Sequence, residues 1–199
     1  MPEIISPEEL AELKKVPGEV RGSSLKSEFE FVISEQGEAG LKRLEEALEQ
    51  LGCHLKYEEI KTMDFYPLWM DVVNMVTIKR LFNLNDQKIY EMGQREAKFS
   101  LIIRIFMRYF FSIDKVVSEV PAIWKKFFTL GELEIVKFDK DRKSAIVRIK
   151  NFKINPIYCF NLAGYFASVV QMVIGSEVIC KETKCVFRGD PYDEFSLTW

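Results

Sequence analysis

The sequence has no excess charge of either sign and no phosphate-binding loop, and both absences exclude functional classes. Its 199 residues include 28 basic and 30 acidic side chains, which leave a formal net charge of −2. Such a chain has no positive field to attract a phosphate backbone, so direct nucleic-acid binding is not expected. The stretch VRGSS at 20–24 lacks the glycine spacing and the lysine of a nucleotide-binding loop.

Segments that direct a protein to or through a membrane are also lacking. The start, MPEIISPEEL, has neither the basic beginning nor the apolar run of a secretory signal. The longest apolar run, Ser100 to Ser112, contains Arg104 and Arg108 and falls short of the roughly 20 residues that a spanning helix needs. We therefore expect a cytoplasmic protein without membrane insertion.

Histidine and cysteine are scarce, which narrows the chemistry of any site. His54 is the only histidine, and no serine or cysteine partner for a catalytic triad can be identified. We expect His54 to be a capping or surface residue, with a haem ligand or a general base as alternatives. In a reducing compartment, cysteines are expected as buried thiols or metal ligands. The chain has four, Cys53, Cys159, Cys180 and Cys185.

In the first two-thirds of the chain, most apolar residues recur at the spacing of helices. Ser6, Pro7 and two following acids predict a short helix towards Lys15, and residues 20–37, which have no clean period, are expected to form a loop or a short helix. Leucines at helical spacing followed by a glycine predict the next helix, and a break at 83–86 separates two more. The predicted helices are therefore 7–15, 41–51, one on each side of 83–86, and 115–127.

After Gly131, apolar and polar residues alternate, as they do in strands. ELEIVKF and SAIVRIKNF flank the polar turn DKDRK, a helix is predicted over 156–174 before Gly175, and SEVICKETKCVF and DEFSLTW alternate again. We predict one α+β domain over residues 1–199. In it, a helical N-terminal half packs on a four-stranded antiparallel sheet, made of two C-terminal hairpins with a helix between them.

Residues able to bind a metal are concentrated in the last fifth of the chain: Cys159, Cys180, Glu182, Cys185 and Asp193. The candidate ligands are Cys159, Glu182, Cys185 and Asp193. On a regular strand Glu182 and Cys185, three residues apart, point to opposite faces. Both can reach one ion only if the chain bends or bulges near 183–184. Two thiolates and two carboxylates suit a closed tetrahedral zinc site. Buried thiols beside solvated acids are the alternative, which spacing alone leaves open.

Aromatic and methionine side chains are dense between residues 63 and 128. Most must belong to the core, yet they exceed what a small sheet obviously requires, so an internal apolar pocket or a dimer interface is also expected. An arginine in this context could pair with an acidic ligand. The candidate ligand-binding residues are Trp69, Phe99, Arg104, Phe106, Tyr109 and Trp124.

The C-terminal segment ETKCVFRGDPYDEFSLTW resembles the closing hairpin of the 4-vinyl reductase domain. Segments at 20–22, 89–93, 120–124 and 131–133 are also similar to haem- and nitric-oxide-binding relatives of that superfamily, which includes the TRAPP vesicle-tethering subunits. The resemblance spans most of the chain. It implies a helix-covered antiparallel sheet, commonly a homodimer, that encloses a hydrophobic pocket used for sensing or regulation and not for catalysis.

The same resemblance implies zinc and argues against haem. In aromatic-sensing regulators with this domain, zinc is held by a Cys before the last helix, by Glu-x-x-Cys and by a later Cys. Cys159, Glu182 and Cys185 match the first three, and Asp193, whose oxygen is an acceptable zinc ligand, stands in place of the last. Haem is not expected, because Tyr-x-Ser-x-Arg is missing and His54 lies far upstream of the family's haem ligand.

These observations predict a regulatory or sensor module that binds a small hydrophobic or aromatic ligand. The alternative is a dimeric scaffold of the TRAPP type without a small-molecule ligand. An enzyme acting on a tetrapyrrole is not expected, because no acid–base pair stands out in the sequence.

Overall fold

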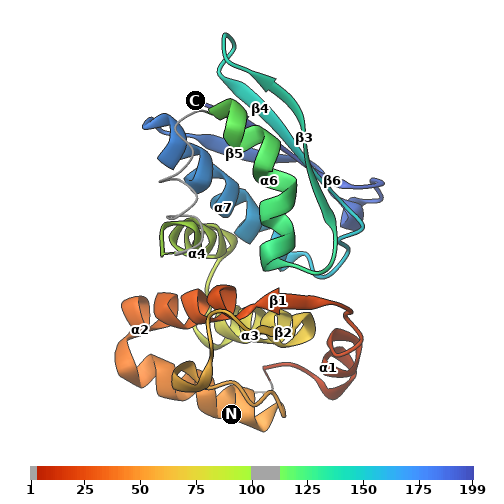
Figure 1. The fold of residues 1–199 in the computed structure, drawn as a ribbon. Coiled ribbons are helices and arrows are strands. Elements are labelled where there is room, and N and C mark those ends of the chain that lie inside the picture. The colour runs from red at the N-terminus through yellow and green to blue at the C-terminus, as the bar shows by residue number, and fades with distance from the viewer. Residues whose placement is uncertain (1–3, 100–112) are drawn as a thin grey trace.

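The computed structural model describes the backbone of residues 4–99 and 113–199 and the side chains of 4–98 and 117–199 (Figure 1). The apolar run at 100–112, with the candidate residues Arg104, Phe106 and Tyr109, lies outside these ranges, and so does the side chain of Phe99.

The chain begins with a capped helix and a short two-stranded ribbon. Helix α1 (Pro7–Leu13) starts as predicted, with the Glu9 N–H donating to Ser6 Oγ at 3.2 Å. Strand β1 (Glu19–Arg21) then pairs antiparallel with β2 (Phe65–Pro67). The sequence predicts neither strand, because three residues are too few to establish an alternation.

Helix α2 (Gly22–Gln50) corrects the prediction of a loop or short helix over 20–37. Its first part buries Leu25, Phe29 and Val32 at helical spacing, but it also buries Ser24 and Glu28, which interrupt the apolar stripe in the sequence. The helix bends at Gly37, whose φ of +67° is accessible to glycine at little cost. Its second part is the predicted helix ending before Gly52.

The next helices lie where the sequence predicts them. A single 3₁₀ turn, η1 (Tyr57–Glu59), precedes them, and Pro67 stands at the N-cap of the first. The break at 83–86 falls between the first and the second. The three helices are α3 (Leu68–Leu81), α4 (Asp86–Phe99) and α6 (Ile113–Phe127).

The C-terminal third forms the predicted antiparallel sheet of two hairpins. The first hairpin is β3 (Glu132–Asp139) and β4 (Ser144–Lys150), and the second is β5 (Ile179–Lys184) and β6 (Asp193–Thr198), joined by a 3₁₀ turn, η2 (Val186–Arg188). The strand order is β3-β4-β6-β5. Helix α7 (Ile157–Ile174) connects the hairpins and stops at Gly175.

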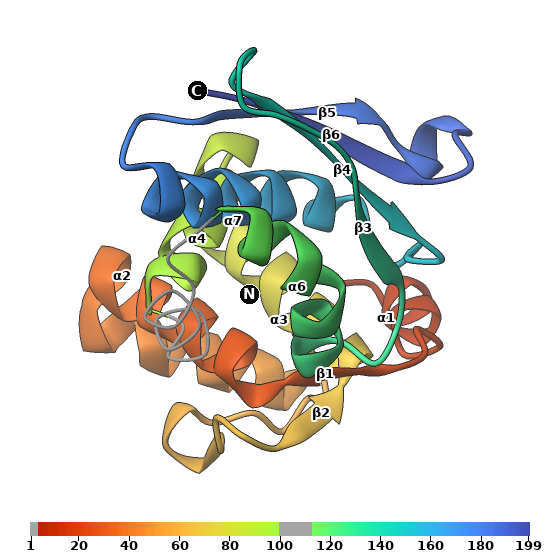
Figure 2. The same ribbon diagram turned by 45° about the horizontal axis from the view of Figure 1, so that its top comes forward.

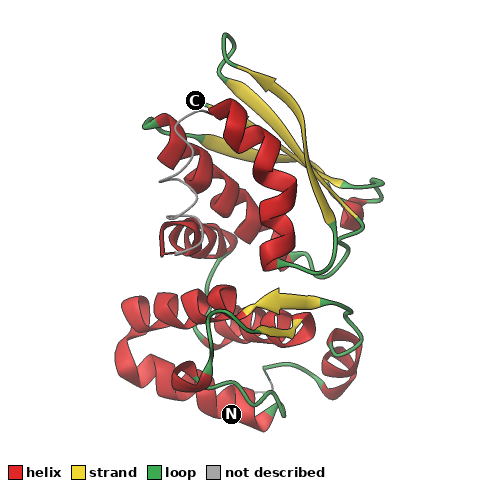
Figure 3. Ribbon diagram, viewed as in Figure 1, coloured by secondary structure: helices red, strands yellow, loops and turns green. Residues whose placement is uncertain are grey.

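Two helices cover one face of this sheet. Inward residues alternate along β4 and β6, and α6 and α7 lie over them (Figure 2). Helix α4 packs on α7, whereas α1, α2 and α3 lie at the end of the molecule farthest from the sheet (Figures 1 and 3). The α+β class is confirmed. The predicted packing of the helical N-terminal half on the sheet is not confirmed, because the described helices that contact the sheet are α6 and α7.

Helices α4 and α7 cross with their backbones in direct contact. A Cβ atom added to Gly93 would lie 1.9 Å from the carbonyl oxygen of Asn161, and one added to Gly164 would lie 1.9 Å from that of Tyr90. No side chain fits at either position. These two glycines therefore fix the distance between the helices.

Helix α7 contains no charged residue and is mostly apolar. Among the described helices it alone has the length and composition to cross a membrane, and half of that window is buried inside the molecule. Its place between α4 and the sheet accounts for this composition, because a helix covered on two sides needs little polar surface.

Candidate functional site

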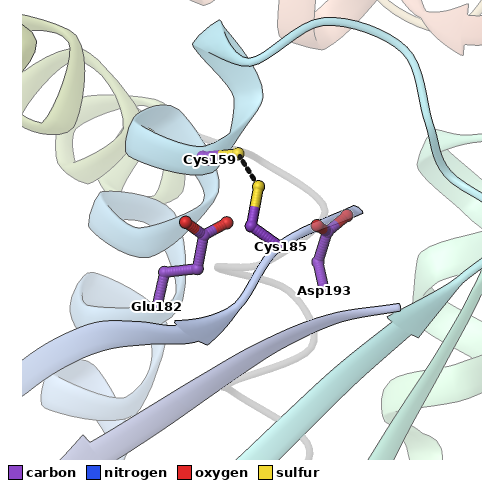
Figure 4. A group of neighbouring side chains, drawn as sticks. All are labelled: Cys159, Glu182, Cys185 and Asp193. Carbon is purple, nitrogen blue, oxygen red and sulfur yellow. Dashed lines mark hydrogen bonds between the residues drawn. The ribbon is translucent and has the colours of Figure 1, made fainter. Parts of the chain in front are cut away.

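The four predicted metal ligands lie together (Figure 4). Cys159 lies in the first turn of α7, Glu182 on β5, Cys185 just after β5, and Asp193 at the start of β6. Their ligand atoms all lie within 4.8 Å of one another, and the two Sγ atoms are 3.5 Å apart. Residues from distant parts of the sequence thus meet at one point, where the second hairpin meets α7.

The bend that this arrangement requires is present in β5. The pairing of β5 with β6 shifts register between Glu182 and Lys184, so Thr183 is the extra residue of a bulge. Glu182 and Cys185 consequently reach the same side of the strand, towards α7 (Figure 4). The predicted distortion near 183–184 is confirmed.

Backbone N–H groups hold the carboxylates of this loop in place. The N–H of Val186 donates to Asp193 Oδ1 at 2.8 Å, and the N–H of Cys185 donates to Asp190 Oδ2 at 2.8 Å. The turn closes through Gly189, whose φ is +95°. These hydrogen bonds therefore set the conformation of the loop and leave the Cys185 thiol facing Cys159.

The electrostatics of the cluster are unfavourable for thiolates without a cation. Burial raises the pKa of the Cys159 thiol, and the adjoining Glu182 and Cys185 raise it further. Burial also raises the pKa of Asp193, although the N–H of Val186 opposes this. Glu182 Oε2 pairs with Arg188 at 2.9 Å, but its Oε1 is buried without a hydrogen-bond partner in the described structure.

The donor set fits a tetrahedral zinc ion. With Zn–S bonds of about 2.3 Å, two thiolates of a tetrahedron stand about 3.8 Å apart. The observed separation of 3.5 Å between the Cys159 and Cys185 sulfurs is close to this, and the buried Oε1 of Glu182 would gain a partner. The alternative of solvated acids does not hold, because Asp193 is buried and Glu182 is largely so.

A second feature is an apolar cavity of about 70 Å³ where α4, α6, α7 and β3 meet. Trp124 belongs to its wall and is fixed there by an Nε1–H bond of 3.0 Å to the carbonyl oxygen of Leu130 and by stacking on Phe128. The lining residues are Glu96, Val120, Ile123, Trp124, Phe127, Phe128, Leu133, Asn161, Leu162, Tyr165, Phe166 and Val169.

A further cavity of about 60 Å³ adjoins the first, between α6, α7 and the sheet. All of its lining residues are apolar, and they include Ile135 and Val147 from the sheet. The two cavities share four lining residues, Val120, Leu133, Phe166 and Val169. They are therefore neighbouring parts of one apolar layer, separated by the thickness of these side chains.

The first cavity has a polar end formed by Glu96 and Asn161. Asn161 is only 3% exposed, and its Nδ2 has no hydrogen-bond partner within the described structure. Burial raises the pKa of Glu96 to about 7, and the nearby side chains of Ser24 and Asn161 oppose this shift. A polar group that entered here would meet an unpaired donor beside a carboxyl group.

Two more buried acids lie behind this end. Glu28 Oε2 accepts a hydrogen bond from Asn74 Nδ2 at 2.6 Å, and Asp71 Oδ2 accepts one from the Tyr158 hydroxyl. Burial raises the pKa of Glu28 well above its ordinary value and that of Asp71 to about 7. No pattern in the sequence marks this cluster, because acids in a helical segment are normally expected to face solvent.

The predicted ligand-binding residues fall into three groups. Trp124 lines the cavity, whereas Trp69 does not, because it lies on α3 under the Lys14 ammonium, 5.4 Å from the ring centroid. The other four, Phe99, Arg104, Phe106 and Tyr109, lie outside the described side chains. Sequence reasoning missed the α7 wall, although its helical spacing was visible in Leu162, Tyr165, Phe166 and Val169.

His54 lies at the end of α2, as the surface interpretation predicts. Its side chain is 72% exposed, and Nδ1 lies 3.0 Å from Glu49 Oε2. It is absent from the walls of both cavities and from the metal-competent cluster.

No protein-family model matches the chain, and no curated protein sequence matches it. Solved structures match it over 89% of its length. The fold is that of H-NOX domains. An H-NOX protein from S. oneidensis, solved in its Fe(II)NO ligation state, matches with 12% identity, 97% of its chain covered and a TM-score of 0.67. A point mutant of an H-NOX protein from K. algicida, solved as Fe(II) unliganded, matches with 13% identity, 95% of its chain covered and a TM-score of 0.64.

At these identities the likeness concerns the fold alone. Two of the H-NOX neighbours were solved with Fe(II), and another matching structure was solved in a study of haem redox potential. The residues do not fit a histidine-ligated haem, because the single histidine is remote and the cavity is much smaller than a porphyrin. The expectation that haem is absent remains a prediction.

Proposed function

We propose that the protein is a regulatory or sensor module that binds a small apolar ligand between α4, α6, α7 and β3. The observation that carries this proposal is the apolar cavity with one polar end. Such a cavity, with few converging polar groups, is the usual form of a small-molecule site. The H-NOX fold supports the proposal, since one such domain was solved in an Fe(II)NO ligation state. Binding without catalysis is proposed.

We also propose that Cys159, Glu182, Cys185 and Asp193 hold a structural zinc ion. The support is the compact donor set, the buried unpaired oxygen of Glu182 and the absence of a basic group other than Arg188 among the cluster's described ion pairs. Four protein ligands leave no open position, which is the mark of a structural site. The ion would bind the start of α7 to the second hairpin.

Helix α7 connects the two proposed sites. Cys159 occupies its first turn, and Asn161, Leu162 and Val169 on the same helix line the cavity. A ligand that shifts α7 would therefore act on the hairpin as well. This arrangement gives the proposed sensor a physical route from ligand to the molecular surface.

The ligand proposal is tested by filling the cavity. Val169 lines both cavities, so Val169→Phe should block ligand entry. For the unsubstituted protein, a ligand at about 100 times its Kd should add about 2.7 kcal/mol to the free energy of unfolding, and a thermal scan against aromatic and aliphatic molecules measures this. The matched control is Val136→Phe on β3, where the side chain is 45% exposed. A shift that survives in Val169→Phe, or no shift with any molecule, contradicts the proposal.

The dimeric scaffold remains the rival function, and homodimerisation remains a prediction. Large apolar side chains that are exposed lie on separate elements, so no single face is marked out among the described residues. They are Met63, Val136, Phe160, Ile179 and Phe187. Light scattering at micromolar concentration separates the alternatives, since a monomer that binds a ligand contradicts the scaffold.

A further inference from the structure

We infer that the cavity selects a slender aliphatic molecule with a terminal hydroxyl group, in preference to a fatty acid or an alkylamine. The inference deepens the proposed function, on which it rests, by naming the chemistry of the ligand. It stands on three observations: the arrangement of the two cavities, the unpaired amide of Asn161, and the acids behind Glu96.

The cavities favour a slender apolar body. Each offers modest free space, about 70 Å³ and about 60 Å³, and the two adjoin along α6 and α7 at four shared lining residues. The second is lined by aliphatic and phenylalanine side chains alone. A flexible chain can pass between such side chains after small rotamer changes, whereas a broad ring system would require the helices to separate.

The polar end matches a hydroxyl group. Asn161 Nδ2 is a buried donor without a partner, so it gains most from an acceptor. Glu96 lies at the same end of the cavity and, when ionised, can only accept. A hydroxyl oxygen accepts from Asn161 while its hydrogen is donated to Glu96, and it therefore satisfies both groups at once.

Charged head groups fit this end less well. The carboxyl groups of Glu28 and Asp71 are buried near Glu96, and their hydrogen-bond partners in the described structure, Asn74 and Tyr158, are uncharged. A ligand carboxylate would bring a charge into a region where burial already raises the pKa of all three acids, and the same loss of solvation would oppose its own ionised form. An ammonium group could pair with Glu96, but it has no lone pair to accept from Asn161, whose donor would remain unpaired.

Isothermal titration calorimetry of the full chain with ligands of equal chain length tests the inference. The four ligands differ only in their head group. Octanol has a hydroxyl group and octanoate a carboxylate, whereas octylamine has an ammonium group and chlorooctane has a chlorine atom that cannot donate a hydrogen bond. We expect octanol to bind at least about tenfold more tightly than each of the others, because it alone both accepts from Asn161 and donates to Glu96 without carrying a charge into the interior. Among shorter alcohols, affinity should fall by about fourfold for each methylene removed.

Two variants assign the preference to named groups. Asn161→Leu, which keeps the side-chain size but removes the donor, should reduce octanol affinity to that of chlorooctane. Glu96→Gln keeps a hydrogen-bond acceptor at this end and cannot ionise, so octanol binding should persist, while octanoate binding should tighten above pH 7, where Glu96 of the unsubstituted chain is charged. Glu96→Gln carries the test if Asn161→Leu fails to fold.

The outcomes separate this inference from the function on which it rests. Octanoate or octylamine binding as tightly as octanol, or equal affinity for all four heads, overturns the hydroxyl inference and leaves the apolar site standing. If none of the four binds, the proposed function fails together with the inference. A preference for octanol that survives in Asn161→Leu overturns the assigned recognition.

Discussion

Cys180 and Cys185 are both buried thiols, five residues apart, yet only Cys185 belongs to the metal-competent cluster. Cys185→Ser should therefore remove bound zinc and lower the free energy of unfolding by several kcal/mol, on the order of 3–5 kcal/mol, because the ion is bound only by the folded chain. The matched control, Cys180→Ser, should keep its zinc and lose only about 1 kcal/mol. Metal content by mass spectrometry and urea unfolding measure both effects. Equal zinc in the two variants would refute the site.

The buried carboxyl group of Glu96 predicts a particular pH dependence. Its pKa, raised by burial to about 7 from an ordinary value of 4.5, means that the folded chain holds a proton that the unfolded chain has lost between these values. Stability should therefore decline as the pH rises through that window. Glu96→Gln removes this contribution and should be about 1–3 kcal/mol more stable than the unsubstituted chain near pH 8, with little difference near pH 4.5. Urea titrations at both pH values measure the gap, and a gap independent of pH contradicts the burial argument.

At this scale, part of the site could be predicted from the sequence. Cys159, Glu182, Cys185 and Asp193 were found because metals restrict ligands to a few residue types. Asn161 could not be found, because a lone amide in an apolar helix carries no signal until its surroundings are known. The buried acids Glu28, Asp71 and Glu96 could not be found for the same reason.

The crossing of α4 and α7 gives a prediction at the scale of elements. Alanine usually stabilises a helix relative to glycine by about 0.5–1 kcal/mol. Gly164→Ala should do the opposite and cost about 2–4 kcal/mol, because its Cβ would lie 1.9 Å from the Tyr90 carbonyl oxygen. Lys98→Ala on exposed α4 surface is the control and should change stability by less than about 0.5 kcal/mol. Thermal unfolding measures both, and a stabilised Gly164→Ala would show that the helices are farther apart.

Elements were predicted where one periodicity dominates. The two hairpins and α7 have clean alternation or an unbroken apolar helix with a terminal glycine, and they lie as predicted. The first part of α2 was missed because burial of Ser24 and Glu28 breaks its apolar stripe. The bulge in β5 could be predicted only as a condition of the metal site, since no residue there requires it.

For the molecule as a whole, zinc should stabilise one region more than others. Removing the ion with a chelator should speed amide exchange in 179–198 and in the first turn of α7, where the four ligands lie. The β3–β4 hairpin serves as the internal control, because it contributes no ligand and should exchange as before. Hydrogen exchange by mass spectrometry measures this, and uniform acceleration over both hairpins would argue against a local metal site.

The overall architecture could be predicted from the sequence because short segments spread along the chain resembled one superfamily. The fold likeness to H-NOX domains agrees with that resemblance, whereas the 4-vinyl reductase assignment and the homodimer stay predictions. The prediction that haem is absent rests on the residues, because the single histidine is exposed and does not line the cavity. A shared backbone arrangement can be kept while the interior side chains that define a ligand are replaced.

Diffraction from crystals under xenon pressure tests most directly whether the interior accepts a foreign apolar molecule. Xenon enters dry cavities lined by hydrophobic side chains, and its position can be determined even when the natural ligand is unidentified. We predict xenon density between Trp124, Leu162 and Val169, and none there in Val169→Phe. Xenon confined to other places, or none at all, would contradict a binding site in this cavity.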